Sequence, residues 1–106
     1  MITKSIIKSI DRRYFVITSY DLFSVTLKSN NSGDSWMIME CERNHKIGFV
    51  VFHAHDYLTP RHLHGFSNSF DSAIRNIQMH DAYQVNGRVR LTSEEKKKYR
   101  EKYSIK

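Results

Sequence analysis

The feature that most constrains this chain is a strand hairpin that leads directly into a capped helix, between Ser35 and about Tyr83. Residues 35–43 alternate between two sets of side chains, which is typical of a strand with two different faces. Residues 43–46 (RNHK) predict a tight turn, because asparagine tolerates the left-handed backbone that such turns need. The returning strand, residues 47–55, is apolar on both faces from Phe49 to Phe52, so we expect it to be central, with packing on each side.

The helix after the hairpin has its own start signal and a core-facing stripe. Asn68 or Ser69 can cap its first turn, and Asp71 places a negative charge at the positive end of the helix dipole. The i, i+3, i+4, i+7 spacing of a buried stripe is met by Phe70, Ala73, Ile74 and Ile77. We therefore expect this helix to end near Tyr83 and to cover one face of the sheet.

The segments before the hairpin predict further strands. Strand-forming residues dominate from 14 to 28 with a bend at 18–21, and the turn formers NNSGD at 30–34 lead into the hairpin. Residues 1–10 are ambiguous, because isoleucines four apart fit a helix whereas isoleucines that alternate with lysines fit a strand. We favour a strand there, since isoleucine is β-branched.

The end of the chain predicts a second, charged helix. Asn86 and Gly87 indicate a turn, which a short strand at 88–91 is expected to follow. Thr92, with Glu95 three residues later, has the spacing of a capping box, and the residues beyond are rich in helix formers. The apolar content of this helix is thin and rests mainly on two tyrosines four residues apart, Tyr99 and Tyr103.

Together these patterns predict an α+β fold: a small antiparallel sheet of three to five strands, with one helix packed on a face and a charged C-terminal helix. At 106 residues the chain has the common size of one domain. We expect residues 1–91 to form that domain and residues 92–106 to form a basic helix that packs on it or projects from it.

Composition limits the location and the chemistry of the protein. The start of the chain lacks the apolar core of a secretory signal, Cys41 is the one cysteine, and the longest wholly apolar stretch is far shorter than the roughly 20 residues that span a bilayer. We therefore expect a cytoplasmic protein without a membrane partner. The sequence has no nucleophile elbow, phosphate-binding loop or dinucleotide fingerprint, so we expect no enzymatic activity and no cofactor.

Positive charge gathers at the two ends of the chain. The formal charge is +6, and residues 91–106 hold six basic residues against three acidic ones. Basic ends on either side of a nearly neutral middle suit a polyanion, so nucleic acid or a nucleoprotein complex is the expected partner. The candidate contact residues are Arg12, Arg13, Arg43, Lys46, Arg75, Lys96, Lys97, Lys98 and Arg100.

A protein partner is the alternative. Arg75, Met79 and Tyr83 recur at spacing four on the main helix, and these residue types are enriched at protein interfaces. If they are exposed, the chain suits a free-standing inhibitor or adaptor, of the kind that phages and other mobile elements use against host proteins.

A metal-binding protein is the second alternative. Four of the six histidines lie within twelve residues, at His53, His55, His62 and His64. Alternate residues of a strand point to the same side, so His53 and His55 can converge on one ion, and the other two can supply further ligands. Histidines with this spacing more often only cover a sheet edge. We therefore expect no metal, and these four as the ligands if one is bound.

The order of elements from about residue 23 to residue 83, a three-stranded sheet followed by a packed helix, is similar to that of the amino-terminal modules of phage-type integrases. It is also similar to the order in a class of plant DNA-binding domains. Both present the outer face of the sheet to the DNA major groove. The resemblance implies that the sheet supplies the DNA-facing side chains, and here it offers Lys28, Arg43 and Lys46.

Overall fold

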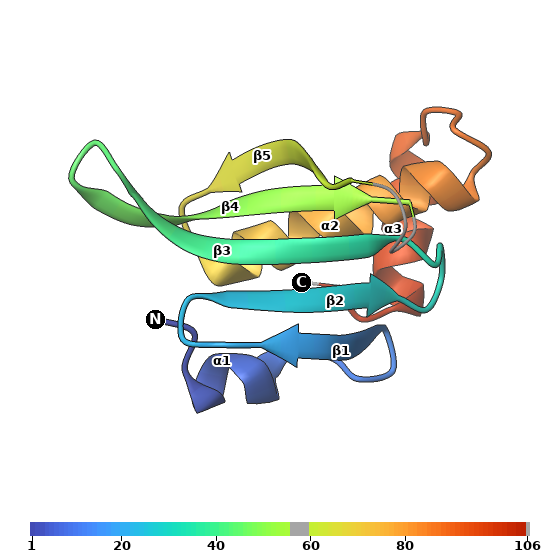
Figure 1. Cartoon of the computed structure of the whole chain (residues 1–106). Helices are drawn as coiled ribbons and strands as arrows, with labels where there is room; N and C mark the ends of the chain where they lie inside the picture. Colours follow the sequence, from blue (N-terminus) through green and yellow to red (C-terminus); the bar gives the residue numbers. More distant parts are fainter. Residues whose placement is uncertain (56–59, 106) are drawn as a thin grey trace.

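The computed structural model describes residues 1–55 and 60–105 of the chain. Its elements, in order, are α1 (Lys4–Ser9), β1 (Phe15–Tyr20), β2 (Ser24–Ser29), β3 (Ser35–Arg43), β4 (Lys46–Ala54), β5 (His62–Ser67), α2 (Phe70–Val85) and α3 (Ser93–Lys102). The strands form one five-stranded antiparallel sheet whose spatial order follows the chain (Figure 1). The α+β prediction, with a small antiparallel sheet and a charged C-terminal helix, is confirmed.

The central hairpin forms as predicted. β3 and β4 pair along their whole length, from Ser35 opposite Ala54 to Arg43 opposite Lys46. The two residues between them, Asn44 and His45, have φ angles of 53° and 63°. Positive φ at both central residues is the signature of a type I′ turn, whose twist matches that of the paired strands.

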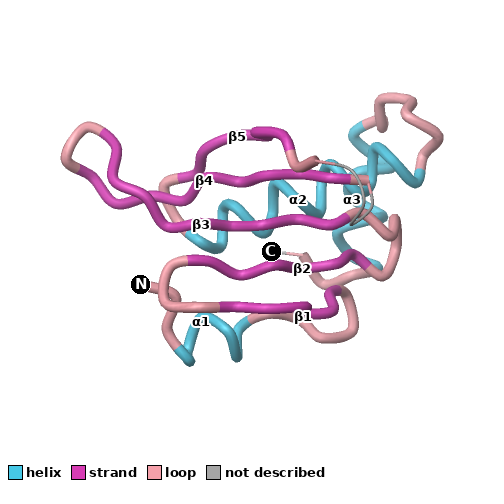
Figure 2. The backbone as a smooth tube through the Cα atoms, viewed as in Figure 1, coloured by secondary structure: helices cyan, strands magenta, loops and turns pink. Residues whose placement is uncertain are grey.

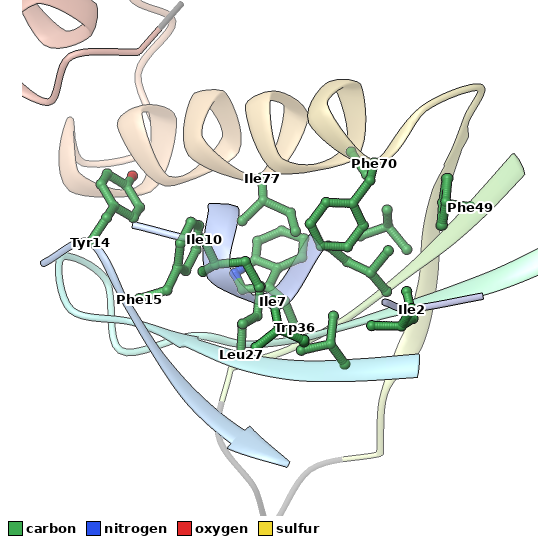
Figure 3. Close-up of a cluster of buried hydrophobic side chains, with 14 residues drawn as sticks. Ile2, Ile7, Ile10, Tyr14, Phe15, Leu27, Trp36, Phe49, Phe70 and Ile77 are labelled. Atoms are coloured by element: carbon green, nitrogen blue, oxygen red, sulfur yellow. The ribbon is translucent and has the colours of Figure 1, made fainter. Parts of the chain in front are cut away.

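One face of the sheet is covered by α2, which runs behind β3 and β4 (Figures 1 and 2). Leu27 and Trp36 point from the sheet toward Phe70 and Ile77 of the helix (Figure 3). Leu27, Trp36 and Ile77 have no exposed surface. Ser69 caps the helix, because its hydroxyl accepts a hydrogen bond from the Ser72 N–H at 3.1 Å. The predicted stripe is therefore what fixes α2 on the sheet.

The opposite face of the sheet is not covered by any helix in the part of the chain that the structure describes (Figure 2). The expectation that β4 packs on both sides is therefore wrong for this face. Met37 lies opposite Phe52 and Met39 lies opposite Val50, and all four side chains are half-buried. Cross-strand pairing lets these apolar side chains shield one another.

The N-terminal segment is a helix, and the expectation of a strand at residues 1–10 is wrong. Thr3 caps α1, since its hydroxyl accepts a hydrogen bond from the Ile6 N–H at 3.2 Å. The helical turn brings Ile2, Ile7 and Ile10 into the same hydrophobic core as Trp36 (Figure 3). Burial of three isoleucines outweighs the β preference of the branched side chain.

Two connections also differ from expectation. The bend predicted at 18–21 lies a few residues later, where the Asp21 carboxylate accepts hydrogen bonds from the N–H groups of Phe23 and Ser24 at 2.9 and 2.8 Å. Residues 88–91 do not form the predicted strand, and Arg88, with a φ of 62°, continues the turn after α2. The Asn86 side chain holds this turn by donating to the Val89 carbonyl at 2.9 Å.

The C-terminal helix packs on the domain. Its capping box is formed, with the Glu95 N–H donating to the Thr92 hydroxyl at 3.2 Å and the Thr92 N–H donating to the Glu95 carboxylate at 3.0 Å. The ring of Tyr103 meets that of Tyr14 edge to face at 5.2 Å between centroids. In the described ranges, no helix combines the length and the apolar character that crossing a membrane requires.

Candidate functional site

Three polar features meet around α2: a histidine and aspartate cluster, a buried carboxylate network and a groove lined with cations. The first, which we call the His–Asp cluster, consists of Asp34, His53, His64 and His80. Asp34 ends the turn between β2 and β3, His53 lies near the end of β4, His64 lies in β5 and His80 lies in α2. Residues far apart in the sequence therefore face one another between the sheet and the helix.

The centre of the His–Asp cluster is a buried ion pair or hydrogen bond. His53 Nε2 lies 2.7 Å from the Asp34 Oδ2, and their side chains are 3% and 8% exposed. The His53 ring is stacked on Trp36 at 4.0 Å between centroids, with an interplanar angle of 19°. The ring of His80 lies 5.0 Å from that of His53, and the ring of His64 lies 4.8 Å from that of His80.

Desolvation favours the neutral form of the three imidazoles, of which His53 is buried, His80 is half-buried and His64 is exposed. Desolvation, with smaller contributions from the neighbouring His64 and His53, lowers the pKa of His80 from 6.5 to about 4, and Asp34 opposes these effects. Desolvation also lowers the pKa of His53 and of His64, and the Asp34 hydrogen bond partly offsets the effect on His53. Neutral imidazole is the form that binds metal ions and accepts protons.

Of the four histidines singled out in the sequence, two belong to the cluster and two surround it. His55 is half-exposed, and its Nδ1 lies 3.6 Å from the Asp34 Oδ1. The exposed ring of His62 lies 5.1 Å from that of His53. Sequence reasoning missed Asp34 and His80. The position of His80 on the sheet side of the helix could have been predicted, because it follows Ile77 by three residues and so continues the core-facing stripe.

The second feature is the buried carboxylate of Asp81, which has no exposed surface. It accepts hydrogen bonds from the hydroxyls of Ser29, of Ser32 at 2.7 Å and of Tyr14 at 3.0 Å. The Tyr14 hydroxyl also lies 2.5 Å from that of Tyr99 in α3. Burial raises the pKa of Asp81, and burial beside this carboxylate raises the pKa of Tyr14. The network fixes α2 to the sheet and to α3.

The third feature, which we call the cationic groove, lies between α2 and α3. It is a hollow of about 360 Å³ lined by Arg75, Met79, Tyr83, Arg90, Leu91, Lys96 and Arg100. No acidic residue of the described part of the chain lines it. Within residues 1–55 and 60–105, none of its four basic side chains makes an ion pair, whereas Lys98 on another face of α3 pairs with Glu94 at 3.8 Å.

The structure brings together some of the predicted contact residues and separates others. Arg75 of α2 meets Lys96 and Arg100 of α3 in the cationic groove, where Arg90 joins them. Lys97 and Lys98 are exposed on α3 but do not line the groove. Sequence reasoning missed Arg90, because it lies in the segment that was expected to be a strand.

The other predicted cations lie elsewhere. Arg12 and Arg13 are exposed in the turn before β1, and Arg13 lies 3.5 Å from the Asp11 carboxylate. Arg43 and Lys46 lie at the tip of the β3–β4 hairpin, which points away from the connection between α2 and α3 (Figure 1). The Arg43 guanidinium stacks over the Phe66 ring at 5.1 Å. These four residues do not extend the groove.

The His–Asp cluster and the cationic groove adjoin. A hollow of about 400 Å³ exposes the edges of His64 and His80 and is also lined by Met79 and Tyr83. Met79 and Tyr83 line the cationic groove as well. About one helical turn of α2 therefore separates the imidazole groups from the cations of the groove.

Comparisons with protein-family models, with curated proteins and with solved structures give no match for this chain. The resemblance in element order to integrase-type modules implies a cationic outer sheet face. The register places Met37, Met39, Val50 and Phe52 across the middle of that face, with Lys28 at one end and Arg43 and Lys46 at the other. Function is therefore inferred from the chemistry of the sites on the helix side of the sheet.

Proposed function

We propose that this protein binds single-stranded nucleic acid, free or within a nucleoprotein complex, and that the cationic groove is the contact. The observation that carries the proposal is that one groove is lined by four cations from three segments, which form no ion pair with any described residue: Arg75 in α2, Arg90 in the connection, and Lys96 and Arg100 in α3. Several cations that reach one backbone at the same time are what phosphate affinity requires.

The apolar part of the groove favours a single strand. Tyr83 lies among the cations and is 37% exposed, and Met79 lies one turn before it on α2. An exposed aromatic ring within a basic channel stacks unpaired bases of any sequence. The base pairs of a duplex are stacked on each other and cannot use such a ring.

The rigidity of the groove also supports binding. Its two walls are held at a fixed angle by the contact of Tyr14 with Asp81 of α2 and Tyr99 of α3. Walls that are already positioned lose little conformational entropy when a ligand binds. The groove is therefore ready for a ligand in the free protein.

The test is a binding titration with a fluorescently labelled single-stranded oligonucleotide, followed by anisotropy at several salt concentrations. We expect affinity to fall steeply with salt, with a log–log slope of about 0.7 for each phosphate contacted. The triple variant Arg75→Glu, Lys96→Glu, Arg100→Glu should lose binding. The triple variant Arg12→Glu, Arg13→Glu, Lys46→Glu makes the same change in net charge outside the groove and should keep most of it.

Equal losses in the two triple variants would mean that net charge, and not the groove, determines binding. A complex that is insensitive to salt would contradict the proposal. A partner that remains bound to the purified protein after nuclease treatment would favour the alternative, a protein-binding inhibitor or adaptor.

A further inference from the structure

We propose that the protein binds one zinc-type divalent metal ion through Asp34, His53 and His80, with His64 as the fourth ligand. This site is separate from the cationic groove. The proposal stands on the geometry of the His–Asp cluster and does not depend on nucleic-acid binding.

The distances between the ligand atoms suit a single ion. One ligand atom each from Asp34, His53 and His80 lie within 4.8 Å of one another. Tetrahedral ligands with bonds of about 2.0–2.1 Å lie about 3.3 Å apart. The Asp34 Oδ2 and His53 Nε2 lie 2.7 Å apart at hydrogen-bond distance, so an ion would replace the proton that they share and move these two atoms about 0.6 Å farther apart.

The three ligands are held by three separate supports. The Asp34 N–H donates to the Ser32 hydroxyl at 3.2 Å, and its carbonyl accepts from the Ser29 N–H at 3.0 Å. His53 is fixed by its stacking on Trp36. His80 is adjacent in sequence to Asp81, whose carboxylate is buried in its own network. A metal site needs ligands that are oriented before the ion arrives.

A β-bulge brings in the fourth ligand. Val51 of β4 lies opposite Gly65 and the next residue, Phe52, lies opposite Leu63, so His64 is the extra residue of β5. In regular pairing His64 would lie opposite Phe52 on the open face of the sheet. The bulge turns it to the helix side, where its ring lies 4.8 Å from that of His80 and 5.1 Å from that of Trp36. Bulges commonly re-aim a side chain beside a functional site.

The ligand chemistry selects the class of metal. Three imidazoles and one carboxylate suit zinc and its neighbours in the first transition series, whereas magnesium and calcium prefer sites built from oxygen alone. The second Asp34 oxygen, Oδ1, lies 3.6 Å from the Nδ1 of His55. His55 is therefore placed to orient the carboxylate as an outer partner of the site.

The test uses untagged full-length protein, stripped with a chelator and titrated with zinc in competition with a chromophoric chelator. We expect one ion per chain. Asp34→Asn and His80→Gln should each weaken binding by about 100-fold or more, since they remove a ligand and not merely an outer partner. The control is His45→Asn, because His45 lies exposed in the hairpin turn and asparagine tolerates its positive φ.

Cobalt(II) gives a readout that does not depend on whether the variants fold. Cobalt bound to the wild-type chain should show the intense visible absorption of a four-coordinate site. A spectrum equal to that of cobalt in buffer, zinc binding without one-to-one stoichiometry, or equal losses in the His45→Asn control would each overturn the proposal. None of these results depends on the oligonucleotide titration.

Discussion

His80 and Asp81 are consecutive residues of α2, and their side chains enter two different buried polar clusters. The ring of His80 meets His53 and His64, whereas the Asp81 carboxylate accepts from Ser29, Ser32 and Tyr14. Both clusters draw on the segment from the end of β2 to the start of β3, one through Asp34 and the other through Ser29 and Ser32. This segment and one step of α2 therefore organise the polar interior of the protein.

The Asp81 network should contribute strongly to stability. Asp81→Ala leaves the hydroxyls of Ser29, Ser32 and Tyr14 without their acceptor, and we expect it to lower the free energy of unfolding by about 3 kcal/mol. Urea unfolding followed by circular dichroism measures this change. The matched control is Glu101→Ala on the exposed face of α3, which should stay within about 0.5 kcal/mol of the wild type. Equal effects would refute the role given to Asp81.

The second prediction concerns the contribution of the contact between α2 and the sheet to stability. Ile77 has no exposed surface, so Ile77→Ala should cost about 3 kcal/mol of unfolding free energy through lost burial and a new cavity. Ile47 is 64% exposed in β4, and Ile47→Ala should cost much less. Urea unfolding compares the cost of the same substitution, isoleucine to alanine, at a buried position and at an exposed one. Similar costs at both positions would mean that α2 does not rest on the sheet as described.

Stability should fall in acid because of His80. Its pKa is 6.5 in the unfolded chain and about 4 in the folded one, so between these pH values the unfolded state binds more protons. The contribution of His80 to the unfolding free energy should therefore have its full value above pH 6.5 and decrease as the pH falls toward 4. We expect a loss of about 2 kcal/mol from His80, allowing for its partial exposure.

His80→Gln removes this titration, and its stability should change less than that of the wild type between pH 6.5 and 4. His53 and His64 lie beside His80 and contribute their own slopes, and Asp34 faces the same cluster. The comparison therefore rests on the difference between the two proteins measured at each pH. Parallel curves across this range would show that His80 is not the titrating group.

Two single variants should distinguish the stacking contribution to oligonucleotide binding in the cationic groove from the charge contribution. Tyr83→Ala should weaken oligonucleotide binding by roughly tenfold without changing its salt dependence, because a ring contributes stacking and no charge. Arg100→Ala should instead reduce the log–log salt slope by about 0.7, the value for one phosphate contact. Anisotropy titrations at several salt concentrations distinguish the two. A lower salt slope in Tyr83→Ala would contradict the role given to this ring.

Much of the fold could be predicted because its signals are local. The turn at Asn44, the cap at Ser69 and the capping box at Thr92 each involve residues within a few positions of one another. Residues 1–10 were predicted wrongly because the spacing of their isoleucines satisfies both a helix and a strand. The choice between the two is made by contacts of Ile7 and Ile10 with residues much later in the chain.

The sites were harder to predict because their members come from distant segments. The histidines of β4 and β5 stand out in the sequence, but Asp34 and His80 reach His53 only through the hairpin register and the placement of α2. The two walls of the cationic groove were likewise visible as separate patterns. Their meeting depends on the positive φ of Arg88 and on the buried network of Asp81, neither of which has a local signature.

The position of His80 and Tyr83 less than one turn apart on α2 has a consequence for any two ligands of this protein. Their rings lie 6.1 Å apart, and both border the same hollow. Any effect that a ligand at one of these sites has on affinity at the other is reciprocal, because thermodynamic linkage requires it. The factor by which an ion beside His80 changes the affinity for an oligonucleotide therefore equals the factor by which the oligonucleotide changes the affinity for the ion.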